Sequence, residues 1–296
     1  MADEGYILAT AAHNEEAYIG ATIESVIAQT VPPRRWVIVS DASTDGTEEI
    51  VRRYEKSSGI IDLVSLRRDP SRNFRSQVYA ILAGFERLRE TPCTWIGNLD
   101  ADIILEPDYY ERILERFRTD PRLGLAGGFI YEWKDNAYRS RSFNREYSVP
   151  HAIQLFRKEC YDAFGGYLPL KYGGPDWHAE VTARMKGWKT RCFPEIRVYH
   201  QRLTGSAESA ARAQLRLGRL DYSLGSHPLF ELLKCLNRMP ESPFVVGSLL
   251  RMAGFFWLAL RREERPVSRE FIRFLRKEQM DRVRGIIFRE RRTSRS

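Results

Sequence analysis

The chain has 296 residues, of which 43% are hydrophobic and 12% are aromatic. That is enough apolar material for one large core or two modest ones, and it excludes a disordered tail. The acidic start, MADEGYIL, lacks the basic region and long apolar stretch of a signal peptide, which predicts a cytoplasmic protein. The cysteines lack the paired spacing of a zinc site or a redox dithiol, so we interpret them as reduced thiols. They are Cys93, Cys160, Cys192 and Cys235.

The net charge of +8 is concentrated at the C-terminal end of the sequence. Residues 261–296 contain thirteen Arg or Lys and six Asp or Glu, so this tail carries +7 and the rest of the chain is close to neutral. A basic tail of this kind can bind nucleic acid or an anionic membrane surface, or simply keep the protein in solution.

Apolar runs and amphipathic stretches alternate through the first hundred residues. The apolar runs predict buried strands at residues 6–12, 36–40, 60–66 and 94–100. Between them, apolar residues with helical spacing predict helices at residues 14–30, 43–57 (after a polar turn) and 76–90. This alternation indicates an α/β fold whose central sheet is mostly parallel and has helices on both faces. In such sheets, ligands bind at the carboxyl ends of the strands.

Polar clusters follow three of the predicted strands. The first strand ends in AAHNEE, the second in SDASTDGT and the fourth in LDAD. Because parallel strands end at the same edge of a sheet, we expect Glu15, Asp41 and the pair Asp100 and Asp102 to converge there.

Each cluster also has a plain structural explanation. Asn14 or Glu15 can begin a helix, and Asp102 can be a loop residue. Turn formation or helix capping explains the polar residues of the second cluster, which are Ser43, Thr44 and Asp45. Three acidic clusters at successive strand ends nevertheless favour one shared site over three coincidences.

The order AAHNEE, VSDASTDGT and NLDAD resembles that of glycosyltransferase family 2, and the resemblance extends over residues 6–200. It implies a GT-A fold and an inverting transfer of a sugar from a UDP or GDP sugar, with Mn²⁺ or Mg²⁺ as cofactor. It also implies a nucleoside pocket formed by the backbone of Ala11, Ala12 and His13 and by the carboxylate of Glu15. Asp41 would contact the base.

Carboxylates beside a diphosphate require a hard cation between them, and Mg²⁺ and Mn²⁺ bind both kinds of oxygen. We expect Asp102 to be the direct metal ligand and Asp100 to point, across Ala101, toward the ribose or a metal-bound water. The metal would act as a Lewis acid on the leaving diphosphate. Because this positive charge arrives with the donor, the pair needs no protein cation beside it. Arg72 and Arg75 either contact the diphosphate or are solvated.

Residues 170–191 resemble the acceptor-side motif of the family, in which an acidic pair begins a helix. Here the pair is Pro175 and Asp176, so the resemblance assigns the catalytic base to Asp176 and leaves open any supporting role of the missing first acid. Asp176 can also simply stabilise the helix dipole. We expect Glu180 to be structural, and Trp177 either to stack on a sugar or to anchor the core.

A further strand ends at His200. The resemblance implies that this histidine is a second metal ligand or a diphosphate contact, and neutral imidazole suits Mn²⁺. A structural role is the alternative. Arg202 is a candidate for contact with the diphosphate. We expect residues 127–150, including Trp133 and Tyr138, to line the pocket that selects the substrate.

The last third of the chain predicts helices. They fall at residues 210–236, with a break at GSHP, and at 268–290. Residues 243–260 are apolar but are interrupted by Arg251 and are shorter than the roughly 20 residues of a membrane span. An apolar stretch before a basic helix is typical of a segment that lies in the membrane interface, and packing on the core is the alternative.

We therefore expect a catalytic GT-A domain at residues 1–205 and a helical, basic, membrane-associating region at 206–296. The resemblance implies polysaccharide or glycolipid biosynthesis with a glycan or polyprenyl-linked acceptor, at the inner face of the cell membrane and without a nucleic acid partner. A sugar nucleotidyltransferase would need a glycine-rich basic loop after the first strand, which AAHNEEAYIG does not provide. A non-enzymatic binding protein would leave the aligned acids unexplained.

Overall fold

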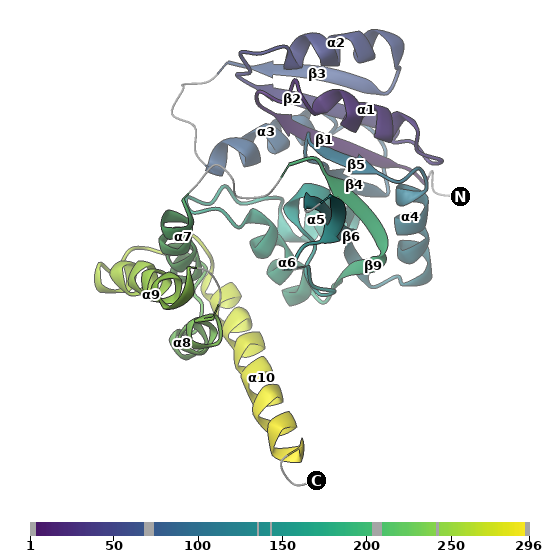
Figure 1. Cartoon of the computed structure of the whole chain (residues 1–296). Helices are drawn as coiled ribbons and strands as arrows, with labels where there is room; N and C mark the ends of the chain where they lie inside the picture. Colours follow the sequence, from purple (N-terminus) through teal and green to yellow (C-terminus); the bar gives the residue numbers. More distant parts are fainter. Residues whose placement is uncertain are drawn as a thin grey trace. The chain divides into compact units, whose positions relative to one another are not determined.

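The computed structural model describes residues 4–67, 74–134, 136–142, 144–202, 209–240 and 243–293. The chain divides into two compact units. The first comprises residues 1–171 and 175–204, and the second residues 172–174 and 205–296. The first unit holds a sheet with helices on both faces, and the second holds helices α7 to α10 (Figure 1).

The sheet of the first unit has the strand order β3-β2-β1-β4-β8-β6-β9-β5, and β7 pairs with β6. Its strands are β1 (Tyr6–Ala12), β2 (Arg35–Asp41), β3 (Ile61–Leu66), β4 (Trp95–Asn98), β5 (Ile103–Leu105), β6 (Leu123–Lys134), β7 (Ala137–Ser140), β8 (Leu155–Arg157) and β9 (Lys189–His200). The four strands predicted in the first hundred residues are therefore confirmed.

The sheet is parallel throughout only one half, although β6 and β9 in the other half are also a parallel pair. Strands β3, β2, β1 and β4 are parallel neighbours, as predicted. Beyond β4 the sheet is mixed, because β8 runs antiparallel to both β4 and β6, and β5 runs antiparallel to β9. The prediction of a mostly parallel sheet is wrong for this half. Parallel neighbours need a long crossover, whereas β6 and β7 are separated by only two residues and form an antiparallel pair.

Helices cover both faces of the sheet, as predicted (Figure 1). Helices α1 (Ile19–Ile27), α2 (Thr47–Ser57) and α4 (Tyr109–Thr119) pack on one face, and α3 (Phe74–Arg87), α5 (Lys158–Phe164) and α6 (Pro175–Met185) on the other. Strand β1 supplies both layers because successive side chains point to opposite faces. Tyr6 and Leu8 join the first core, and Ile7 and Ala9 join the second.

Helix α1 begins at Ile19, five residues later than predicted, because the loop before it is bonded to the next loop. Asn14 has a left-handed φ of 54°, which a helix does not accommodate. Its Oδ1 accepts a hydrogen bond from the backbone N–H of Thr44 at 2.8 Å, and the N–H of Glu15 donates to Oγ1 of Thr47 at 2.7 Å. The loops after β1 and β2 therefore form one rigid rim at the edge of the sheet.

The second unit contains α7 (Ala210–Ser223), α8 (Pro228–Asn237), α9 (Phe244–Leu260) and α10 (Arg269–Thr293), so the predicted break at GSHP is confirmed. Helices α7 and α9 pack closely because each has a glycine at the contact. A Cβ atom added to Gly218 would lie 1.9 Å from the carbonyl oxygen of Arg251, and one added to Gly254 would lie 2.1 Å from that of Leu215. No described helix combines the length and the apolar character needed to cross a membrane.

Arg251, which interrupts the apolar sequence of α9, points into the helical unit and is only 7% exposed. Its Nη2 lies 2.5 Å from Oδ2 of Asp221, and its Nε lies 3.0 Å from Oε1 of Glu231. Lys234 contacts the same two carboxylates at 2.9 and 2.7 Å. The charge is therefore neutralised inside the unit, and it does not reach the outer face of α9.

Replacing Arg251 with leucine should destabilise the protein by about 3 kcal/mol, because two buried carboxylates would then share one cation. Chemical denaturation of the full chain measures this change in the free energy of unfolding. Arg269→Leu is a matched control at an exposed helical position, and it should change the stability by less than about 0.5 kcal/mol. If the two variants are equally stable, the buried ion network does not contribute to the free energy of unfolding as proposed.

Candidate active site

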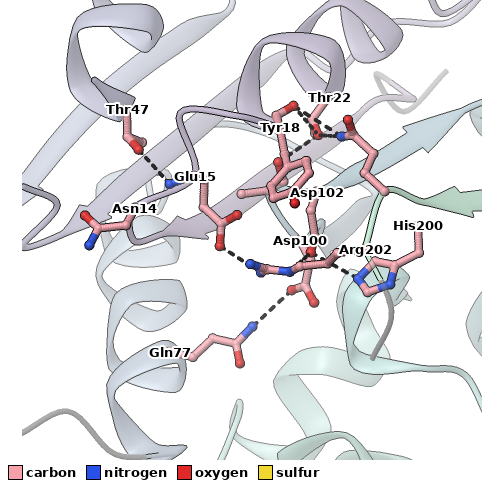
Figure 2. Close-up of polar contacts among 12 residues, drawn as sticks. Asn14, Glu15, Tyr18, Thr22, Thr47, Gln77, Asp100, Asp102, His200 and Arg202 are labelled. Atoms are coloured by element: carbon pink, nitrogen blue, oxygen red, sulfur yellow. Dashed lines mark hydrogen bonds and ion pairs between the residues drawn. The ribbon is translucent and has the colours of Figure 1, made fainter. Parts of the chain in front are cut away.

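The carboxyl ends of β1, β2 and β4 meet at one edge of the sheet, where Glu15 and Asp102 face each other across Arg202 (Figure 2). The loops after β1 and β2 also touch, because Nδ1 of His13 lies 2.6 Å from the carbonyl oxygen of Asp41. Asp41 itself is buried. The structure therefore brings together the strand ends that the sequence predicted to converge.

A protein cation neutralises the acids at this edge. Nη2 of Arg202 lies 2.8 Å from Oε1 of Glu15, and its Nε contacts Oδ2 of Asp102. The guanidinium also lies over the ring of Tyr18, 5.6 Å from its centroid. The structure therefore places a protein cation beside Asp102, although the sequence interpretation did not require one. Carboxylates as buried as these need a positive partner, and a residue 100 positions from Asp102 and 187 from Glu15 supplies it.

Strand register places His200 beside Asp102. In the antiparallel pair β5 and β9, Ile103 lies opposite His200, so the residue just before Ile103 meets the imidazole. Nε2 of His200 is 3.1 Å from Oδ2 of Asp102, and Nδ1 is 3.6 Å from Oε1 of Glu132. Glu132, which the sequence did not single out, is in turn paired with Arg141 at 2.6 Å. Nothing in its local sequence marks it, because only the register of β6 and β9 places it opposite His200.

The pKa directions agree with a fixed ion pair. Burial alone raises the pKa of Asp102, but His200 and Arg202 outweigh it and lower that pKa below its ordinary value. For Arg202, burial lowers the pKa, yet Asp102 and Glu15 outweigh it and raise the pKa. Glu15 differs, since burial raises its pKa by more than Arg202 lowers it. Asp102 and Arg202 are therefore both charged at neutral pH.

Asp100 has a different set of neighbours from Asp102. Nε2 of Gln77 donates to Oδ1 of Asp100 at 3.0 Å, and Nδ1 of His151 lies 3.8 Å from the same oxygen (Figure 2 shows the Gln77 bond). Burial lowers the pKa of His151, but Asp100 and Asp176 outweigh it and raise the pKa. His151 is a second residue that the sequence did not mark. It lies near both Asp176, the candidate base, and Asp100, the candidate donor-binding acid.

Asp176 is the second residue of α6 and is half-buried. One turn further along the helix, Glu180 is only 1% exposed. Its Oε1 accepts hydrogen bonds from the backbone N–H of Val149 at 2.7 Å and from the hydroxyl of Ser148 at 3.0 Å. Glu180 thus fastens α6 to the segment that precedes His151, which supports its structural interpretation.

The loop acids and the other predicted binding residues have various surroundings. Asp45 accepts from the backbone N–H of Thr47 at 3.0 Å, which supports its role as a turn former. Trp177 is half-buried under the guanidinium of Arg184, 5.5 Å from the ring centroid. Arg75 is exposed in the first turn of α3. Arg72 lies outside the described residues.

Trp133 and Tyr138 form an exposed edge-to-face pair at the end of the β6 and β7 hairpin, with ring centroids 5.1 Å apart. Tyr138 also packs against Tyr199 at 4.7 Å. Because successive residues of a strand point to opposite faces, these rings lie on the other face from Glu132 and His200. Their role in lining the pocket that selects the substrate stays a prediction.

The residues at this edge fit a divalent cation that brings further ligands with it. Oδ1 of Asp102 is buried and has no hydrogen-bond partner among the described residues, and the imidazole of His200 lies beside the same carboxylate. In the described part of the chain, no group of three or more His, Cys, Asp or Glu residues is arranged to hold a metal. Mg²⁺ and Mn²⁺ commonly take one or two protein ligands and complete their coordination with phosphate oxygens and water.

Glu180 gives a pH-dependent prediction. Burial, assisted by Asp176 and opposed by Arg184, raises its pKa from 4.5 to about 8. When folding raises the pKa of a carboxyl group, the protein becomes less stable as the pH rises from the pKa of the unfolded state to that of the folded state. Glu180→Gln keeps an oxygen acceptor but cannot ionise, so it should gain a few kcal/mol relative to the wild type between about pH 4.5 and pH 8.

Thermal unfolding of both proteins across this pH range measures the effect. The exposed Glu115→Gln on α4 is the control, and its difference from the wild type should not change with pH. Parallel pH profiles for Glu180→Gln and the wild type would show that Glu180 ionises normally.

Known proteins resemble this chain in both sequence and fold. Poly-beta-1,6-N-acetyl-D-glucosamine synthase from Staphylococcus aureus (strain COL) is 27% identical over 125 residues, which is 42% of this chain and 28% of that protein. The enzyme of the same name from Staphylococcus epidermidis is 26% identical over the same shares. The alignment thus spans less than a third of the length of these relatives.

Solved structures with the same fold include S. aureus TarS (residues 1–349) in complex with UDP-GlcNAc. It has 13% identity and a TM-score of 0.55, and the match covers 85% of this chain and 71% of that one. The mannosyltransferase PcManGT from Pyrobaculum calidifontis, in complex with GDP-Man and Mn²⁺, has 16% identity and a TM-score of 0.56 over 91% and 78% of the two chains.

The sequence model of Glycosyl transferase family 2 matches residues 8–170, which is more than half of the chain and includes the ends of β1, β2 and β4. The resemblance seen in the sequence is therefore confirmed, and so is the α/β fold, although its sheet is mixed. This chain belongs to glycosyl transferase family 2 and is a glycosyltransferase.

Proposed function

We propose that the protein transfers a sugar, with inversion, from a UDP or GDP sugar to a hydroxyl of a glycan or lipid-linked acceptor in polysaccharide or glycolipid synthesis. The observation that carries this proposal is the cluster of Glu15, Asp102, His200 and Arg202 at the strand ends of a family 2 chain. The relatives are polysaccharide synthases by name, and the structural neighbours were solved with UDP-GlcNAc or GDP-Man.

In this proposal, residues 1–205 form the catalytic domain, and the donor lies along the carboxyl edge of the sheet. The rigid rim formed by the two loops supports a nucleoside pocket, because its backbone is fixed by bonds between the loops. The proposed donor-binding residues are Ala11, Ala12, His13, Glu15, Asp41, Arg72, Arg75, Asp100, Ala101, Trp177 and Arg202.

Asp102 and His200 are the proposed holders of Mn²⁺ or Mg²⁺. When bound, such a cation offsets the charge that develops on the leaving diphosphate. The free Oδ1 of Asp102 supports this assignment, as does the carboxylate of Glu132, which lies 3.6 Å from the other nitrogen of His200. Mn²⁺ is also present in the structure of the mannosyltransferase neighbour.

Asp176 is the proposed base. It takes the proton of the acceptor hydroxyl as that oxygen bonds to the anomeric carbon and the bond from this carbon to the diphosphate breaks. Attack opposite the leaving group inverts the anomeric centre. The clamp between Glu180 and Val149 supports this role, because it fixes the helix that carries Asp176.

Asp176→Asn tests the reaction. The variant should keep its affinity for UDP or GDP within about twofold and lose sugar transfer by roughly 10²–10⁴-fold, which is the usual contribution of a general base. Calorimetry measures the binding, and release of the nucleotide measures the transfer. Asp162→Asn, on an exposed part of α5, should retain both properties. An active Asp176→Asn enzyme would remove Asp176 as the base.

We further propose that residues 206–296 bind the anionic inner face of the cell membrane, where a polyprenyl-linked acceptor would lie. Among the described residues, sixteen large apolar side chains are exposed, and eleven of these lie on α8 and α9. Four leucines on α8 follow the spacing of one helical face. They are Leu229, Leu232, Leu233 and Leu236.

The outer face of α9 has apolar side chains with an arginine next to them, as expected of a surface that binds a membrane interface. Val246, Leu249 and Leu260 are exposed there, while the only charged residue of the helix, Arg251, is buried. Arg261 directly follows the helix and lies over the ring of Trp257 at 4.6 Å. Apolar side chains next to arginines suit the boundary between acyl chains and anionic headgroups.

Flotation with vesicles that contain an anionic phospholipid tests this surface. Leu249→Glu combined with Leu260→Glu should reduce the bound fraction at least about tenfold, because two apolar contacts are replaced by repulsive charges. Ile27→Glu, at an exposed apolar position of the sheet unit, is the control and should float like the wild type. Equal flotation of all three proteins would disprove membrane binding through α9.

A further inference from the structure

Arg202 makes its two ion pairs with the acids that lie closest to the proposed cation site. Its Nε contacts Oδ2 of Asp102, the oxygen that Nε2 of His200 also approaches at 3.1 Å. Its Nη2 holds Glu15 at 2.8 Å. Both carboxylates are buried, while the side chain of Arg202 is 44% exposed. The guanidinium thus forms the outer wall of the acidic cluster.

We propose that Arg202 is an internal counter-ion that keeps a divalent cation away from Asp102 until a nucleotide diphosphate binds and takes over the guanidinium. This inference rests on the proposed metal role of Asp102 and His200. It adds an order of binding to that role, in which the nucleotide admits the metal.

The charges at the site give the physical reason for this order. A divalent cation that approaches alone meets a guanidinium already in contact with the same carboxylate, and like charges a few Å apart repel strongly in a partly buried site. If the cation displaced Arg202, Glu15 would remain buried without its partner, which is costly. Both effects weaken the binding of metal to the free protein.

A diphosphate removes both obstacles. Its oxygens accept paired hydrogen bonds from a guanidinium, so Arg202 can exchange Asp102 for phosphate without losing an anionic partner. The exchange needs a movement of the side chain only. The backbone next to Arg202 stays in place, because the N–H of Gln201 donates to the carbonyl oxygen of Asp102 at 2.9 Å. The side-chain amide of Gln201 also donates to the carbonyl oxygen of Tyr18 at 3.2 Å. Metal and nucleotide therefore increase each other's affinity, and this coupling is reciprocal.

Titration with Mn²⁺, followed by the electron paramagnetic resonance signal of the free ion, measures metal binding with and without UDP or GDP. The wild type should bind Mn²⁺ at least about tenfold more tightly with the nucleotide than without it. Arg202→Gln should bind Mn²⁺ alone about tenfold more tightly than the wild type and should bind the nucleotide more weakly. These changes have opposite signs, so a general folding defect cannot produce them. Arg202→Ala should behave in the same way and replaces the glutamine variant if that variant does not fold.

Two controls separate charge at this position from other effects. Arg202→Lys keeps the positive charge and should continue to exclude Mn²⁺ in the absence of nucleotide. Arg116→Gln removes an arginine with the same 44% exposure, an ion pair with Glu195 at 3.0 Å and a ring contact with Phe193 at 5.2 Å. Because Arg116 lies on α4, away from Asp102, its replacement should leave Mn²⁺ binding unchanged.

The possible failures can be told apart. If neutral variants of Arg202 bind Mn²⁺ alone no better than the wild type, the counter-ion role is overturned. The metal role still stands in that case if Asp102→Asn abolishes the uptake of Mn²⁺ with nucleotide. If the lysine variant binds Mn²⁺ alone as tightly as the glutamine variant, charge is not the cause and the inference fails. If the wild type takes up no Mn²⁺ even with UDP or GDP, the proposed metal role fails and this inference fails with it.

Discussion

The architecture of the site depends on the cost of burying carboxylates. Asp102 and Glu15 are almost completely shielded from solvent at the edge of the sheet, and a buried anion is tolerated only beside positive charge. Arg202 meets this requirement, and His200 lies beside Asp102 at 3.1 Å; both residues come from the end of β9, far along the chain. The pairing of β9 with β5 therefore supports the site and also places the side chains that contact its acids.

The two aspartates that follow β4 differ because their neighbours differ. Asp102 contacts Arg202 and His200, whereas Asp100 accepts a hydrogen bond from Gln77 and lies near His151. The neighbours of Asp100 connect it to α6, because the segment before His151 is bonded to Glu180 on that helix. One side of the pair thus faces the proposed cation site, and the other faces the helix that carries the proposed base.

The helical unit has most of its ion network inside and an apolar surface outside. Its ion network of Arg251, Asp221, Glu231 and Lys234 is mostly inside, while large apolar side chains of α8 and α9 face outward. Burial of a compensated charge lets an apolar sequence contain an arginine without placing it on the exposed face. An exterior of this kind is unusual for a surface exposed only to water, which is why we propose a membrane partner for it.

The sequence by itself determined the alternation of strands and helices, the acidic strand ends and the family, because these depend on local periodicity and on residues close together in the chain. It also predicted the helical C-terminal third and the break before Pro228, since proline at a helix start acts locally. It did not place the start of α1, because bonds between two loops override the helical pattern there. Strand register and topology decided the rest: the mixed half of the sheet, the approach of Glu132 to His200, and Arg202 as the partner of Glu15 and Asp102. These side-chain contacts join residues that are 68 to 187 positions apart, and no local pattern encodes them.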